Sequence, residues 1–178
     1  MEVMVLIPIV VLYFVVKALI FGTDDELGKE KKRFAEGMAL LKGRNFQEGK
    51  LWFDVQLIKS PKSGLAWACR GECHLALGNI YEALSDLNNA CKLQTDLPEA
   101  YLNKGKALYM LNDFENAFIE LDKAVWHFRN NGEAFYYRAM VLLHMGDIAK
   151  ANSDFRLAVS FGSEEANQYI RRQQEWYW

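Results

Sequence analysis

Residues 77–83, Leu-Gly-Asn-Ile-Tyr-Glu-Ala, return 34 residues later as residues 111–117, Leu-Asn-Asp-Phe-Glu-Asn-Ala. In the first copy Gly78 stands directly before an amide residue, and in the second copy Asn112 stands directly before an acidic residue. Gly and Asn tolerate the left-handed backbone that a helix C-cap requires. Each copy therefore predicts a tight turn between two helices.

The same spacing of 34 residues runs through most of the chain. Small residues recur in two series, and large apolar residues recur in a third. The series are Gly37, Gly71, Gly105 and Ala139; Gly49, Ala83, Ala117 and Ala151; and Phe53, Leu87, Leu121 and Phe155. Small residues let two helix backbones approach closely, and large apolar residues fill the remaining space. Because one helix pair cannot bury its apolar face alone, the pattern predicts stacked pairs of antiparallel helices.

These segments resemble the helix-turn-helix centre of the tetratricopeptide repeat (TPR). Trp67, Tyr101 and Phe135 occupy the aromatic position of that family near the start of the first helix of a unit. The resemblance implies an all-α fold, a right-handed α-solenoid of about four helix pairs. The four units span residues 30–63, 64–97, 98–131 and 132–165.

The first unit departs from the family pattern. Arg33 replaces the aromatic residue, and Gln56 replaces a late Ala. Arg44, with Gly43 before it, stands at the turn position, so we expect this turn to be shifted by one residue.

The first 22 residues have another character, because nearly every residue from Val3 to Phe21 is apolar. A helix of this length reaches roughly across the ~30 Å hydrocarbon core of a bilayer. We therefore expect a transmembrane anchor over residues 1–22 and a linker over residues 23–29, in preference to a cleaved signal peptide or a buried core helix. Basic residues lie within and after this helix but not before it. The repeat domain of this single-pass protein is thus expected on the cytoplasmic side, or on the stromal side in a plastid.

Residues 166–178 predict a capping helix with an aromatic tail. The helix is polar on its outside, as the last unit of a repeat array requires. Trp176, Tyr177 and Trp178 form an unusually apolar end. Two interpretations stay open: Trp176 packs under the last unit while the other two lie on the surface, or all three form a docking tail for a partner or a bilayer interface.

Composition and motifs argue against catalysis and against nucleic-acid binding. Lys and Arg number 21 against 23 Asp and Glu, so the cationic excess needed for phosphate backbones is missing. Three cysteines give no disulfide framework. Cys69, Cys73 and His74 could begin a metal or haem site, but buried thiols are the favoured interpretation. With the carboxylates dispersed along solvated faces, we expect no enzyme, no metal and no cofactor.

The candidate site follows from the resemblance, which implies that the first helix of each unit lines a concave groove. The matching residues are Phe34, Met38, Leu41, Leu65, Cys69, Glu72, Leu102, Asn103, Lys106, Tyr109, Tyr136, Tyr137, Met140 and His144. Their aromatic and apolar character suits a helix or an extended peptide, although several are expected to pack between helices instead. The family's clamp for acidic chaperone C-termini is absent, since only Asn103 matches it. Glu72 and Glu133 would repel a carboxylate.

The predicted function is a membrane-tethered scaffold that binds a partner peptide or subunit in this groove. Its role would be in the assembly of a membrane protein complex, or as an accessory subunit of one. In size and layout the chain resembles the small thylakoid proteins, with one anchor and a short repeat domain, that assist photosystem I assembly. The alternative is a periplasm-facing anchored TPR protein that assists export or cytochrome maturation.

Overall fold

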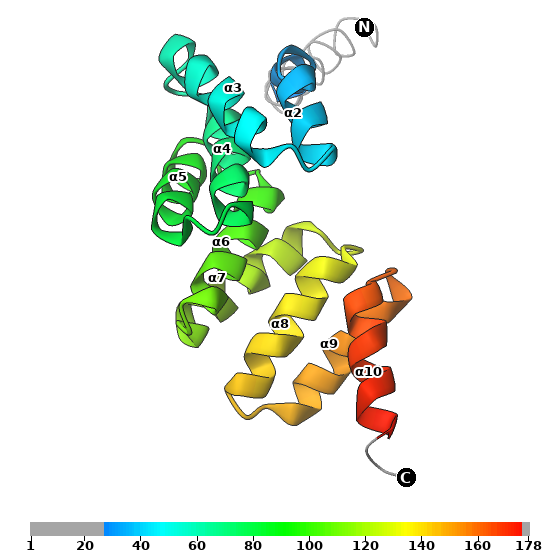
Figure 1. Ribbon diagram of the computed structural model, residues 1–178. Coiled ribbons are helices and arrows are strands. Elements are labelled where there is room, and N and C mark those ends of the chain that lie inside the picture. The colour runs from blue at the N-terminus through cyan, green and yellow to red at the C-terminus, as the bar shows by residue number, and fades with distance from the viewer. Residues whose placement is uncertain (1–26, 176–178) are drawn as a thin grey trace, which may run out of the picture.

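The computed structural model describes residues 27–175, and residues 1–26 and 176–178 lie outside this description. Within the described range, a helical segment at residues 27–33 is followed by nine helices in one curved array (Figure 1). They are α2 (Ala35–Lys42), α3 (Phe46–Lys59), α4 (Gly64–Ala76), α5 (Ile80–Leu93), α6 (Pro98–Met110), α7 (Phe114–His127), α8 (Gly132–His144), α9 (Ile148–Ser160) and α10 (Glu164–Glu175). The predicted all-α solenoid is confirmed for this part of the chain.

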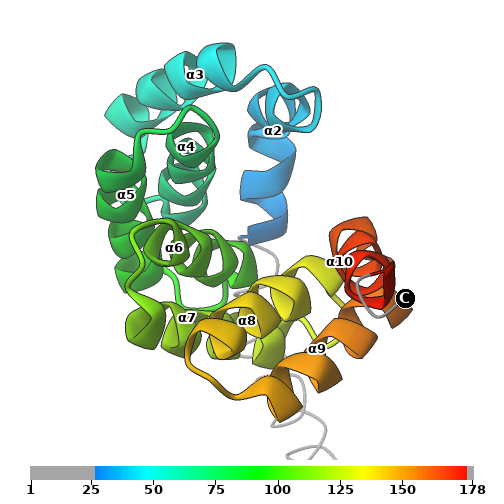
Figure 2. The ribbon, with the colours of Figure 1, turned by 60° about the horizontal axis from the view of Figure 1, so that its bottom comes forward.

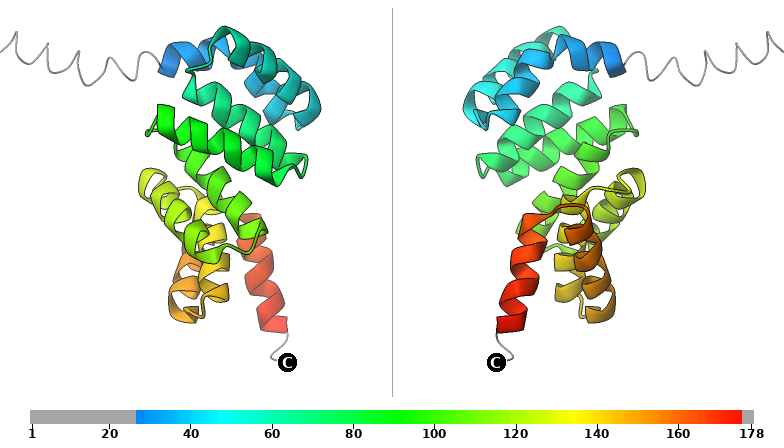
Figure 3. Two further views of the ribbon diagram at one scale, coloured as in Figure 1. Left: turned by 90° about the vertical axis from the view of Figure 1, so that its left-hand side faces the viewer. Right: turned by 90° about the vertical axis from the view of Figure 1, so that its right-hand side faces the viewer.

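The helices pack mainly against their neighbours in the sequence, as hairpins of helices stacked side by side. Figure 2 shows α2, α4, α6 and α8 on the inner side of the curve and α3, α5, α7 and α9 on its outer side. Contacts also join α2 to α4, α4 to α6 and α6 to α8, so the inner helices form a continuous layer. Figure 3 shows the array from the side, with α2 and α10 at opposite ends. This inner layer forms the concave face of the molecule.

The turns inside the four helix pairs share one backbone geometry. Gly78, Asn112 and Gly146 have φ angles of +81°, +59° and +83°. The residue after each of these, and the residue after Arg44 in the first turn, has a backbone N–H that donates to the carbonyl oxygen five residues before it, at 2.8–3.0 Å. Arg44 itself takes the left-handed conformation, with φ +61°. The expected one-residue shift of the first turn is therefore wrong: the shared hydrogen bond fixes the geometry, and Arg44 adopts it although it carries a Cβ.

Side-chain caps fix where several of the helices begin. Ser63, Asp113, Asn131 and Asp147 each accept a hydrogen bond from the backbone N–H three residues later. Such caps satisfy donors that the first helical turn leaves unpaired. Pro98 occupies the first position of α6, where the missing N–H of proline costs nothing.

The small residues of the first series lie where inner and outer helices touch. A Cβ atom added at Gly105 would lie 2.5 Å from Leu121 Cγ, and one added at Gly71 would lie 2.9 Å from Leu87 Cγ. Both leucines are fully buried. Gly71 and Gly105 therefore let α4 and α6 pack directly on the large apolar residue of their own outer helices.

A ladder of ion pairs, not foreseen from the sequence, accompanies this packing. Its three basic members recur every 34 residues, and each binds an acid sixteen residues later. The pairs are Arg70 with Asp86 at 2.7 Å, Lys104 with Glu120 at 2.9 Å and Arg138 with Asp154 at 2.7 Å. The three acids are buried. The expectation that the carboxylates lie on solvated faces is wrong for these residues, because a paired carboxylate can be buried where a free one cannot.

The predicted membrane localisation requires a correction. Among residues 27–175, no helix combines the length and the apolar character needed to cross a bilayer. The expected anchor at residues 1–22, and most of the expected linker, lie outside the described residues. A single-pass protein with a cytoplasmic, stromal or periplasmic repeat domain is therefore not supported.

We predict that Gly105→Ala destabilises the array by about 1–3 kcal/mol, because the added methyl group would overlap the Leu121 side chain. Urea unfolding of the full chain measures the effect. Gly28→Ala is the matched control, since a Cβ at Gly28 meets nothing within 4 Å. Equal unfolding midpoints for the two variants would contradict the close contact between α6 and α7.

We also predict that Arg138→Met costs about 3 kcal/mol, because it leaves the buried Asp154 without its cation. Adding Asp154→Leu should recover most of this loss, since an apolar pair can replace a buried ion pair. Urea unfolding of the single and double variants distinguishes these cases. Asp122→Asn, at the 58% exposed second partner of Arg138, should cost under about 1 kcal/mol. A double variant no more stable than Arg138→Met would contradict the argument.

Candidate functional site

The expected groove residues divide into a buried group and an accessible group. Phe34 is fully buried and packs edge-on against Trp52 and Phe53, with ring centroids 5.8 and 6.0 Å away. Leu102 is buried in the core cluster around α6 to α9. These two assignments to the groove are wrong, because both side chains fill space between helices. Partly exposed members are Met38, Leu41, Glu72, Lys106, Tyr109, Tyr136, Tyr137 and Met140, and His144 is exposed.

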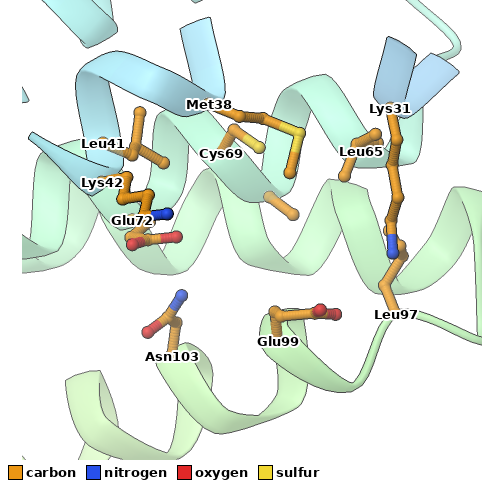
Figure 4. A pocket seen from close by; sticks show the side chains of 11 residues that line it. Lys31, Met38, Leu41, Lys42, Leu65, Cys69, Glu72, Leu97, Glu99 and Asn103 are labelled. Atoms are coloured by element: carbon orange, nitrogen blue, oxygen red, sulfur yellow. The ribbon is translucent and has the colours of Figure 1, made fainter. Parts of the chain in front are cut away.

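A first cavity of about 250 Å³ lies between α2, α4 and α6 (Figure 4). One wall is apolar. Glu99 and Asn103 lie on the opposite side of the cavity, and Glu72 lies at one end. The full lining is Lys31, Met38, Leu41, Lys42, Leu65, Ala68, Cys69, Glu72, Leu97, Glu99 and Asn103. The cavity therefore combines an apolar surface with two carboxylates, an amide and the side chains of Lys31 and Lys42.

A second cavity of about 390 Å³ continues the groove toward α8. It shares Glu72 and Asn103 with the first cavity, so these two residues mark the junction. Its other lining residues are Arg44, Phe46, Leu75, Ala76, Lys106, Met110, Glu133 and Tyr137. The two cavities together make a trough that runs along the inner layer from α2 to α8.

Glu72 is the central charge of this trough. Burial raises the pKa of its carboxyl group, and the charges of Glu133 and Glu99 raise it further. The charge of Lys106 and a hydrogen bond with Asn103 oppose this shift. Lys106, however, forms an ion pair with Glu133 at 2.6 Å. Glu72 thus has no ion pair within 4.0 Å among the described residues, and its charge is held at a cost to folding.

Tyr137 lines the trough near α8, and further aromatic side chains pack beside it. The Phe114 and His144 rings stack with centroids 4.3 Å apart, and Tyr137 meets Tyr109 at 6.0 Å. The Lys106 Nζ lies 5.3 Å from the centroid of the Tyr137 ring. The contact of Phe114 with His144 was not foreseen, because Phe114 begins the outer helix α7 and does not belong to an inner helix. These rings offer large, rigid contact surfaces with polar edges.

The cysteines give no sign of metal or redox chemistry in the described chain. Cys69 and Cys73 are buried, and burial raises the pKa of the Cys73 thiol to about 12. A protonated thiol is a poor nucleophile and a poor metal ligand. Within residues 27–175 no three His, Cys, Asp or Glu side chains are grouped so that they could hold a metal ion. The expected tail site at Trp176, Tyr177 and Trp178 lies outside the described residues and stays a prediction.

Comparison with known proteins agrees with this geometry. A family model described as TPR repeat matches residues 71–112. Tetratricopeptide repeat protein 6 of Homo sapiens is 26% identical over 140 residues, which cover 79% of this chain and 26% of that protein. This chain therefore spans about a quarter of the length of that relative and smaller shares of several others.

Two solved structures are similar to the array. A thermophilic TPR protein of Thermus thermophilus gives a TM-score of 0.63 at 17% identity, covering 80% of this chain and 78% of that chain. The first TPR of Spaghetti, bound to the HSP90 peptide SRMEEVD, gives 0.59 at 18% identity, covering 64% and 91%. The stacked helix pairs place the molecule among the α-solenoids. Residues 71–112 match the TPR repeat family, and the array as a whole has the fold of solved TPR proteins.

We predict that Glu72→Gln raises the melting temperature at neutral pH. The folded-state pKa of Glu72 lies above its unfolded value, so its ionised form destabilises the fold. The parent protein regains this stability as pH falls through the raised pKa, whereas the glutamine variant has no such titration. The difference in melting temperature between the two proteins should therefore disappear below about pH 4. Scanning calorimetry of both proteins across this pH range measures it, and a variant less stable at neutral pH would contradict the assignment.

Proposed function

We propose that the chain is a protein-interaction module whose trough holds a segment of a partner protein, as a helix or an extended peptide. The continuous trough across α2, α4, α6 and α8 carries this proposal. Its side chains stand on packed helices, so little ordering is needed when a partner binds. The Spaghetti TPR, which shares the fold and is bound to an HSP90 peptide, supports the use of such an array for peptide recognition.

Two carboxylates of the trough argue against an acidic C-terminal peptide as the partner, although Lys31, Lys42, Arg44 and Lys106 line the trough as well. Glu72 lies at the junction of the two cavities, and Glu133 lines the second cavity. A partner carboxylate would meet these like charges after losing its water. Asn103 is the single residue that matches the chaperone clamp. We therefore propose a partner whose contacts are apolar, aromatic and hydrogen-bonding.

A scaffold role in protein assembly fits this site. TPR arrays are interaction modules, and the trough combines aromatic rings with hydrogen-bonding groups. Such a surface can hold a subunit during assembly or keep it as a stable accessory partner. Whether that partner belongs to a membrane complex stays a prediction from the sequence.

Site-specific photo-crosslinking tests the proposal. We expect p-benzoylphenylalanine at Met38 or Tyr137, on the trough, to crosslink a partner polypeptide in the native cell. The same group at Ile58, which is 83% exposed on the outer helix α3, is the matched control and should give at least several-fold less of that product. Mass spectrometry identifies the product. Equal crosslinking from all three positions would contradict binding in the trough.

A further inference from the structure

We propose that the first cavity, between α2, α4 and α6, is a subsite for one lysine or arginine side chain of the partner segment. This inference rests on the proposed function and specifies its chemistry. The cavity has an apolar wall for a long stem and carboxylates for a cationic end, and Glu72, at one end of it, lacks an ion pair among the described residues.

The apolar wall suits the methylene stem of a basic side chain. Met38, Leu41, Leu65 and Cys69 form this wall (Figure 4). Lysine and arginine bury three or four methylene groups against such surfaces while their charged end reaches a polar group. A short polar side chain would leave the apolar wall uncovered. A cavity of about 250 Å³ therefore favours a long side chain.

The polar part of the cavity supplies acceptors for the cationic end. Glu72 and Glu99 both line the cavity, and Figure 4 shows Asn103 facing Glu72 from the side on which Glu99 lies. Hydrogen bonds from an ammonium or guanidinium group to carboxylates are among the stronger polar contacts in proteins. An incoming cation would pair with Glu72, which is partly buried and has no ion pair among the described residues. Partner binding would thus offset a cost that the unbound fold carries.

Other occupants fit the cavity less well. An apolar side chain would remove water from Glu72 and give it no partner. An acidic side chain would face Glu72 and Glu99 at close range. Lys31 and Lys42 also line the cavity, but both are exposed on long flexible stems, whereas Glu72 is partly buried on α4. Lys106 is already engaged by Glu133.

Peptide selection provides the test. A phage-displayed library of random peptides is selected on the full chain, and binders are kept if Tyr137→Ala weakens them. A synthetic copy of a retained peptide is compared with analogues in which each Lys or Arg is replaced by norleucine, which keeps the stem and loses the charge. Fluorescence anisotropy gives the dissociation constants for the parent protein, Glu72→Gln, Lys42→Gln and the control Glu82→Gln, at an exposed residue of the outer helix α5.

The proposed subsite predicts that substitutions at Glu72 and Lys42 change the peptide affinity in opposite directions. One norleucine replacement and Glu72→Gln should each weaken binding about tenfold, and together little more than either alone, because they remove the same contact. Lys42→Gln should strengthen binding about twofold, and Glu82→Gln should change nothing. Retained peptides without a basic residue, or with affinities unaffected by Glu72→Gln, would overturn the subsite and leave the trough intact. Recovery of no peptide sensitive to Tyr137→Ala would overturn the proposed function as well.

Discussion

The direct contact between a glycine on an inner helix and a large apolar residue on its outer partner sets the geometry of the array. Gly71 against Leu87 and Gly105 against Leu121 bring the two helices of a pair so close that a Cβ atom at the glycine would overlap the leucine side chain. This contact fixes the rotation of each inner helix about its own axis. Every other residue of that helix is then assigned to a face by its distance from the glycine along the chain.

The neighbours of the small residue show this assignment. The residue just before it, Arg70, Lys104 or Arg138, points to the ladder of ion pairs. The residue just after it lies on the trough side, as Glu72 and Lys106 do in the two cavities. Packing, charge pairing and partner recognition therefore occupy three consecutive positions. If an inner helix packed with its register shifted by one residue, a side chain of the trough would take the place of the cation in the ion-pair ladder.

The sequence could predict the fold because the fold repeats. The turns at Gly78, Asn112 and Gly146 and the close contact at Gly105 follow from residue types that recur every 34 positions. The ion ladder recurs in the same register, but it could not be predicted in this way because charged residues are ordinarily found on solvated helix faces. The first unit shows the limit of the repeat. There Glu36 stands in place of the ladder cation, and Trp52, sixteen residues later, packs over Gly37 where the other units carry an acid.

The candidate site was less predictable, because burial depends on neighbours that a single unit does not contain. Phe34 has the sequence character of a trough residue, yet Trp52 and Phe53 enclose it. The sequence places Glu72 among the groove residues but does not predict its burial, because only the stacking of α6 beside α4 brings Asn103 and Lys106 near it and removes its water. A partly buried carboxylate without an ion pair works against folding, whereas the ladder acids are each satisfied within the chain. This contrast between paired and unpaired buried acids supports the proposal that stability is given up for binding in the trough.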